Sequence, residues 1–81
     1  MFSIQIIYIY DIKAANKKKF NRTKRVFYYR LNKMMLKKEM RKTKSTLAVP
    51  TKMEKAMDSF FKIFGKDILV YKIFAESVEE F

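Results

Sequence analysis

The chain has 81 residues, a formal net charge of +11, and neither cysteine nor histidine. A disulfide-stapled domain is therefore excluded, and a structural zinc site, which needs Cys or His ligands, is not expected. A domain of this size buries only about 60% of the surface that its unfolded chain exposes. We therefore expect association to stabilise it, most simply as a homodimer.

The charge is unevenly distributed along the chain. Residues 13–52 contain fifteen Lys or Arg and a single acid, Glu39, whereas residues 53–81 have a net charge of −2. A polyanion such as nucleic acid is the expected partner of the basic part. A solvated Lys-rich surface is the alternative, but such a surface interleaves both signs of charge, and no acid lies between Lys13 and Lys38.

The first predicted element is a strand over residues 3–12. Its sequence, SIQIIYIYDI, is β-branched or aromatic nearly throughout, which is typical of a central strand covered on both faces. The apolar run 2–10 is too short to span a membrane. Because it lacks a basic segment before it and small residues after it, we expect no signal peptide and a cytoplasmic location.

A basic helix is expected from Lys17 to about Met35. Phe27, Leu31 and Met34 recur at helical spacing, with Phe20 one heptad before Phe27. Residues 36–42 either extend this helix, form a basic loop, or open a hairpin at Met40. Residues 43–49 predict a second strand near the edge of the sheet, since Pro50 follows it.

The second helix is the clearest element of the sequence. Thr51 and Glu54 have the spacing of a capping box, and an apolar stripe continues to Phe64. Gly65 supplies the left-handed residue that ends helices. Residues 67–74 predict a last strand. The tail 75–81 is either an edge strand, a docking segment for a partner, or a frayed end.

These elements indicate one α+β domain spanning residues 1–81. If the middle segment is a hairpin, the order becomes β-α-β-β-α-β and the fold class is ferredoxin-like, with two helices on one sheet. Otherwise the chain forms a β-α-β-α-β variant, a three-stranded sheet that a partner chain completes.

The strongest binding signal is the basic aromatic stretch at residues 17–30. Contacts with about six phosphates would give log K a slope near −5 against log salt. Helical spacing places Lys18, Arg22 and Arg25 on one face. Phe27, Tyr28 and Tyr29 serve either the core or base stacking. The candidate nucleic-acid-binding residues are Lys17, Lys18, Lys19, Arg22, Lys24, Arg25 and Arg30.

The inventory of acid–base residues is poor. There is no His or Cys, and the single glycine cannot build a phosphate-cradling loop. If the chain hydrolyses anything, Asp11 at the end of the first strand is the candidate catalytic residue and Mg²⁺ ligand. Two Asp11 side chains across a dimer axis would bind the metal better than one. Alternatively, Asp11 caps a turn or pairs with Lys13 or Arg22.

The strand ending in Tyr10, Asp11 and Ile12, followed by a basic helix and a Ser-bearing strand, resembles the CRISPR-associated protein 2 family. The resemblance implies a ferredoxin-like, symmetric dimer with a duplex-binding surface, working with an integrase partner in CRISPR adaptation, which is an antiviral defence. Asp11 matches the family's strand-end Asp, a proposed Mg²⁺ ligand for endonuclease activity. Ser45 matches the Ser of the second strand.

Three functions therefore stay open. The first is a nucleic-acid-binding scaffold dimer of the adaptation type. The second is a Mg²⁺-dependent endonuclease, acting on RNA or DNA, that uses paired Asp11 residues. The third is a basic accessory protein associated with RNA or the ribosome. The sequence does not distinguish DNA from RNA as the partner.

Overall fold

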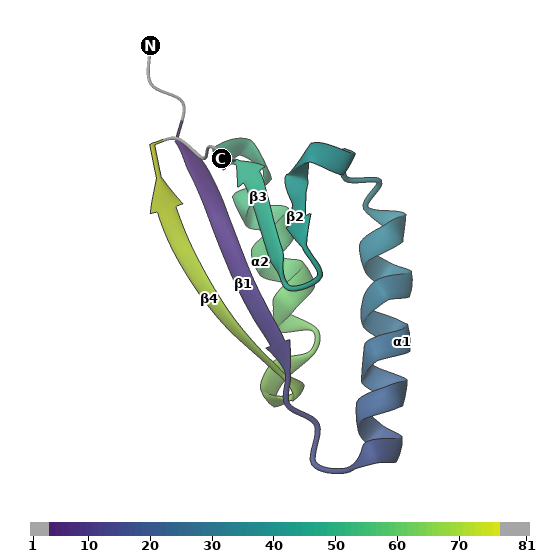
Figure 1. The fold of residues 1–81 in the computed structure, drawn as a ribbon. Helices are drawn as coiled ribbons and strands as arrows, with labels where there is room; N and C mark the ends of the chain where they lie inside the picture. The colour runs from purple at the N-terminus through teal and green to yellow at the C-terminus, as the bar shows by residue number, and fades with distance from the viewer. Residues whose placement is uncertain (1–3, 77–81) are drawn as a thin grey trace.

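A computed structural model describes residues 4–76 of the chain (Figure 1). The hairpin expected as one alternative for the middle segment is present, and it begins directly after Met40. Short 3₁₀ turns precede β2, α2 and β4. The elements are β1 (Gln5–Ile12), α1 (Lys17–Lys33), β2 (Arg41–Thr43), β3 (Thr46–Pro50), α2 (Glu54–Lys62) and β4 (Ile68–Ala75).

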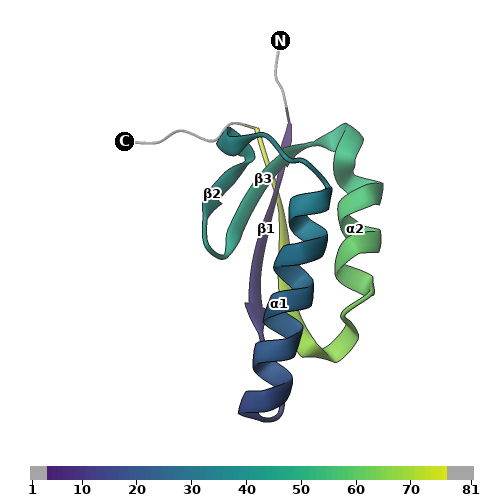
Figure 2. The same ribbon diagram turned by 90° about the vertical axis from the view of Figure 1, so that its right-hand side faces the viewer.

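The four strands form one antiparallel sheet in the order β2-β3-β1-β4. Both helices cover the same face of this sheet (Figure 2). The element order β-α-β-β-α-β and the two-layer arrangement are consistent with a small ferredoxin-like fold. The prediction that the first strand is central is confirmed, because β1 lies between β3 and β4.

The core lies between the sheet and the helices. Alternation along β1 turns Ile6, Tyr8 and Tyr10 toward the helices and leaves Ile9 and Asp11 on the other side. The helices contribute mostly aromatic side chains, whose rings pack edge-on or tilted against one another. The expectation that both faces of the first strand are covered is wrong for the described residues. The core residues of the helices are Phe27, Leu31, Met57, Phe60 and Phe61.

The predicted second strand is too long at its start. Lys44 and Ser45 form the tight turn of the β2–β3 hairpin, and β3 begins only at Thr46. The Ser45 N–H donates to Thr43 Oγ1 at 3.2 Å, a local bond of the kind that favours turns over strands. β3 lies one strand in from the edge, and Pro50 is its last residue.

The expected capping box is wrong. Residues 51–53 form a 3₁₀ turn, and no side chain caps the start of α2. The Glu54 carboxylate instead binds the ammonium group of Lys72 on β4. Glu54 therefore pairs with a distant lysine and not with the backbone at the start of its own helix. Gly65 does have the predicted left-handed conformation, with φ of +54°.

A polar network joins α2 to the sheet. The Tyr8 hydroxyl donates to Asp58 Oδ1 at 2.8 Å, and Lys72 Nζ donates to Asp58 Oδ2 at 3.0 Å. Burial and the Asp58 carboxylate raise the pKa of Tyr8 above its ordinary value. Partial burial of Asp58 favours its neutral form, but the hydrogen bonds from Lys72 and Tyr8 outweigh it, so its pKa is lowered.

Replacing Met35 with glycine should stabilise the protein. Met35 follows the end of α1 with φ of +53° and is 86% exposed, so its side chain adds strain with little burial. A left-handed conformation costs about 1–2 kcal/mol for a residue with a Cβ, and the freer unfolded chain of the glycine variant offsets part of the gain. We expect a net gain of about 0.5–1 kcal/mol, or roughly 2–8 °C in Tm.

Met35→Ala is the matched control, since it removes the same side chain but keeps the Cβ. Thermal unfolding followed by circular dichroism should place Met35→Gly above both the alanine variant and the wild type. A glycine variant no more stable than the alanine variant would show that the left-handed conformation stores no strain.

Asp58→Asn should destabilise the protein at neutral pH and not in acid. A carboxyl whose folded pKa is lowered contributes stability above its unfolded value of 3.8, and that stability disappears as the pH falls through the folded pKa. Since Asp58 is partly exposed, we expect a gap of roughly 1 kcal/mol at pH 7.

Urea unfolding of both proteins at pH 7, 5 and 3 measures this gap. It should persist at pH 5 and narrow at pH 3. Tyr8→Phe removes one of the two hydrogen-bond donors to Asp58. When Asp58→Asn is made in the Tyr8→Phe background, the difference in unfolding free energy should therefore change less between pH 7 and pH 3. A gap of equal size at all three pH values would mean that the charge of Asp58 is not what matters.

Candidate nucleic-acid interface

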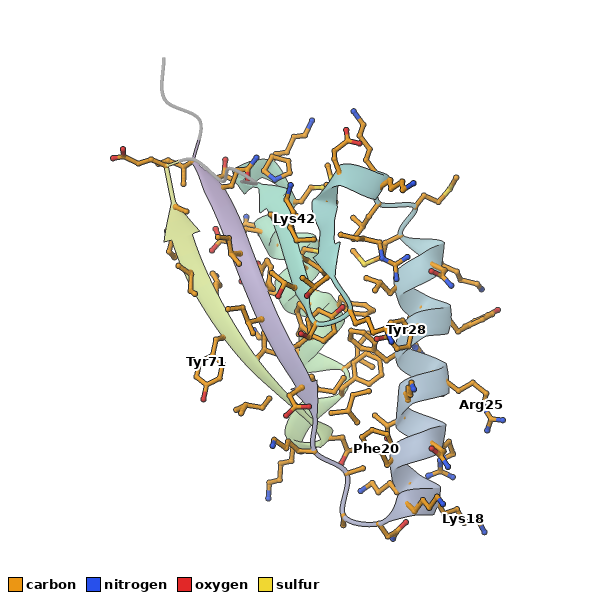
Figure 3. All side chains as sticks on the ribbon, viewed as in Figure 1. Lys18, Phe20, Arg25, Tyr28, Lys42 and Tyr71 are labelled. Atoms are coloured by element: carbon orange, nitrogen blue, oxygen red, sulfur yellow. The ribbon has the colours of Figure 1, made fainter. Side chains whose placement is uncertain are left out.

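The outward side of α1 is basic. Its buried residues, Thr23, Phe27 and Leu31, face the sheet. Lys18, Arg22 and Arg25 lie on the opposite side of the helix, and all three are exposed. Lys18 and Arg25 point away from the sheet in Figure 3. The structure therefore places these three cations together where a polyanion can reach them.

The other four predicted binding residues lie on the flanks of the helix, not on this face. Lys17, Lys19, Lys24 and Arg30 are all exposed. Lys19 Nζ lies 3.3 Å from Asp67 Oδ1, and within residues 4–76 it is the one cation of the predicted seven that forms an ion pair. Lys24 faces the β2–β3 turn, whereas Arg30 lines a hollow beside the end of α2. Arg22 lines the same hollow as Arg30, and Lys18 and Lys19 line a second hollow together with Arg22, so the outward face adjoins the flank that faces α2.

The β2–β3 hairpin extends the basic surface. Arg41 and Lys42 on β2 and Lys44 in the turn are exposed. The Arg41 guanidinium donates to Asn32 Oδ1 at 3.2 Å, which holds the edge strand beside the second half of α1. We call these three hairpin cations, together with Lys18, Arg22 and Arg25, the basic flank. The hairpin cations were not among the predicted site residues, although they lie in the same acid-poor segment 13–52.

Two tyrosines fix the turn that carries Lys44. The Tyr10 hydroxyl donates to the Lys44 carbonyl at 2.8 Å, and the Tyr28 hydroxyl donates to the same oxygen at 3.2 Å. The Tyr10 N–H also donates to the Ser45 carbonyl at 2.9 Å. Burial raises the pKa of Tyr10 to about 12, so this hydroxyl stays a donor at neutral pH. The Ser45 side chain therefore lies at an exposed turn, and not on a strand.

Asp11 lies at the end of β1 on the side away from the helices. Its side chain is 65% exposed, and its Oδ2 lies 3.0 Å from Lys13 Nζ, one of the pairings expected for it. No cluster of three or more acidic, Cys or His residues occurs within residues 4–76. A single carboxylate already paired with an ammonium group offers Mg²⁺ too few oxygen ligands. In one copy of the chain, Asp11 therefore contributes a single carboxylate toward a metal.

The sheet face opposite the helices is apolar and exposed; we call it the open sheet face. Ile9 is 39% exposed and Tyr71 is 59% exposed, and both point away from the helices with Ile7, Leu69 and Ile73. Figure 3 shows Tyr71 on this side of β4. β1 and β4 add no Lys or Arg to this face. The open sheet face is thus mainly apolar, whereas the basic flank is positively charged.

No helix in the described part of the chain is long and apolar enough to cross a membrane. Comparisons with protein-family models, with curated proteins and with solved structures find no match to this chain. The features of the chain that bear on its function are therefore the basic flank, the open sheet face and the side chains between them.

Proposed function

We propose that this protein is a nucleic-acid-binding scaffold that holds a phosphate backbone against its basic flank. The observation that carries the proposal is the exposure of six cations on adjoining elements, none of which pairs with a carboxylate within residues 4–76. When exposed Lys and Arg side chains neutralise phosphates, the counterions condensed on the nucleic acid are released, and this release favours binding. The flank therefore favours binding by charge, without reading a base sequence.

The resemblance to the CRISPR-associated protein 2 family supports a scaffold of the adaptation type, working with an integrase partner. The acid–base inventory supports binding over catalysis, since residues 4–76 contain neither His nor Cys and Asp11 is paired with Lys13. On this proposal a single chain binds nucleic acid, and any chemistry on the strand belongs to other components of the assembly.

We further propose that two copies associate through the open sheet face. Copies with a net charge of +11 repel each other wherever their basic surfaces meet. The open sheet face avoids this cost because β1 and β4 present isoleucine, leucine and tyrosine there and no cation. Since Asp11 lies on the same face, the second copy also brings a second Asp11 to the interface.

Neutralising the outward cations should weaken duplex binding and flatten its salt dependence. With about six phosphate contacts, log K of the wild type should fall with log salt at a slope near −5. A variant carrying Lys18→Gln, Arg22→Gln and Arg25→Gln should lose roughly 2–3 from the size of that slope. Fluorescence anisotropy of a labelled duplex over a salt series measures it.

The matched control removes three positive charges elsewhere, with Lys52→Gln, Lys55→Gln and Lys62→Gln around α2. It should leave the slope nearly unchanged. Equal losses of slope in both variants would show that only the net charge of the protein matters, and absence of wild-type binding would reject the proposal.

Adding Mg²⁺ and checking the probe on a gel tests the nuclease alternative. Cleavage that needs Mg²⁺ and disappears in Asp11→Ala would make the protein a nuclease and reject the scaffold.

Introducing a charge on the open sheet face should separate the dimer. Ile9→Lys places an ammonium group where two apolar faces meet, and a buried unpaired charge costs enough to weaken association at least tenfold, by about 1.4 kcal/mol or more. Val26→Lys is the matched control, because Val26 on α1 is 38% exposed and Ile9 is 39% exposed. Sedimentation equilibrium should show dimers for the control and monomers for Ile9→Lys; a monomeric wild type would reject this interface.

A further inference from the structure

A hollow of about 160 Å³ lies between α1 and the β2–β3 turn, apart from the outward face of the helix. Phe20, Lys24 and Tyr28 line it from α1, where their spacing of four residues forms one row along the helix. Lys44 and Ser45 line it from the turn, and Tyr10, Asp11 and Ile12 from the end of β1. In Figure 3, Phe20 and Tyr28 extend from α1 toward the sheet, whereas Arg25 points away.

The polar groups around the hollow are free to bind an anion. Within residues 4–76, Lys24 and Lys44 form no ion pair, and no hydrogen bond is made by the exposed Ser45 hydroxyl. Two ammonium groups beside one hollow repel each other, and a phosphodiester bound between them would attract both and offset that repulsion. Asp11 also lines the hollow, and its Oδ2 lies 3.0 Å from Lys13 Nζ, so the carboxylate pairs with a third ammonium group and not with Lys24 or Lys44.

The turn that presents these donors is held in place before any ligand arrives. The Lys44 carbonyl accepts from the Tyr10 and Tyr28 hydroxyls, and the Ser45 backbone bonds to Tyr10 and Thr43. Binding therefore does not have to order the backbone of the turn, which lowers the entropic cost of capturing a ligand.

The size and the aromatic rim indicate what the ligand is. A volume of 160 Å³ corresponds to about five water molecules, enough for a phosphate with part of its sugar but not for a whole nucleotide. Phe20, next to Lys24 in the helical row, is 36% exposed and offers a ring on which a base can stack outside the hollow. A base inside a duplex is already stacked on its neighbours, so only an unpaired nucleotide can use this ring.

We propose that the hollow binds one phosphate of a single-stranded or splayed nucleotide, with Lys24, Lys44 and Ser45 on the phosphate and Phe20 under the base. This inference rests on the proposed function, which it deepens by adding a site for unpaired strands that shares Lys44 with the duplex-binding flank.

The test compares a labelled single-stranded oligonucleotide with the same sequence as a blunt duplex, by anisotropy. Phe20→Leu keeps an apolar side chain but removes the ring. It should weaken single-strand binding about five- to tenfold at every salt concentration and leave duplex binding unchanged, since the lost stacking involves one base and this ring is partly covered. Lys24→Gln with Lys44→Gln should reduce the size of the single-strand salt slope by roughly 0.7, the contribution of one phosphate.

Lys18→Gln with Arg25→Gln is the matched control, since it removes the same charge from the outward face. It should affect the duplex at least as strongly as the single strand. Equal single-strand and duplex losses for Phe20→Leu, or none for either, would overturn the hollow while leaving the flank intact. Failure of the wild type to bind any nucleic acid would instead overturn the proposed function. Binding to phosphatidylcholine–phosphatidylserine vesicles that depends equally on Lys24 and Lys44 would assign the phosphate to a lipid headgroup and overturn this site.

Discussion

A tyrosine hydroxyl buried in a core needs an acceptor, because an unpaired buried donor costs about 1–3 kcal/mol. The central strand β1 presents two such hydroxyls to the helices, those of Tyr8 and Tyr10. Tyr8 donates to Asp58 on α2, and Tyr10 donates to the Lys44 carbonyl in the β2–β3 turn. Through these two hydroxyls, β1 holds both α2 and the β2–β3 turn in place. The turn in turn carries Lys44 of the proposed binding surface.

The same arrangement separates the charges of the chain. Glu54 and Asp58 are both taken up by Lys72, so these acids of the second half are used inside the fold and do not neutralise the basic first half. The cations of α1 and of the hairpin stay exposed. The Arg41–Asn32 bond holds the hairpin beside the second half of α1, so cations that lie far apart in the acid-poor segment are carried by neighbouring elements.

Local patterns predicted the elements well and the long-range pairs poorly. The apolar run at residues 3–12, the helical spacing around Phe27 and Leu31, and the glycine at 65 each depend on neighbours within a few residues, and each element is present.

The capping box failed because the partner of Glu54 is Lys72, eighteen positions away, and no local rule contains that pair. The turn at Lys44 and Ser45 was missed for the same reason, since the two hydroxyls that fix it come from Tyr10 and Tyr28. Asp11 was placed correctly at the strand end, but its salt bridge with Lys13 was only one of several pairings that the sequence allowed. Side-chain partners that lie far apart in the sequence are set by the tertiary structure, and no local sequence pattern predicts them.

The positions of the two surfaces make binding and association compatible. The helices cover the face of the sheet opposite the open sheet face (Figure 2). In a dimer joined through that open face, the helix layers lie on the outside. Packed sheets are about 10 Å apart and each helix layer adds roughly 10 Å more, so the two α1 helices are separated by about 30 Å.

That separation exceeds the Debye length of about 8 Å at physiological ionic strength, so the basic outward faces of the two α1 helices repel each other only weakly. Each flank then stays available to its own stretch of nucleic acid. Catalysis by Asp11, in contrast, needs two copies, because a single carboxylate held by Lys13 does not bind a divalent cation well. On the proposed function, binding is a property of one chain, and any metal chemistry is a property of the assembly.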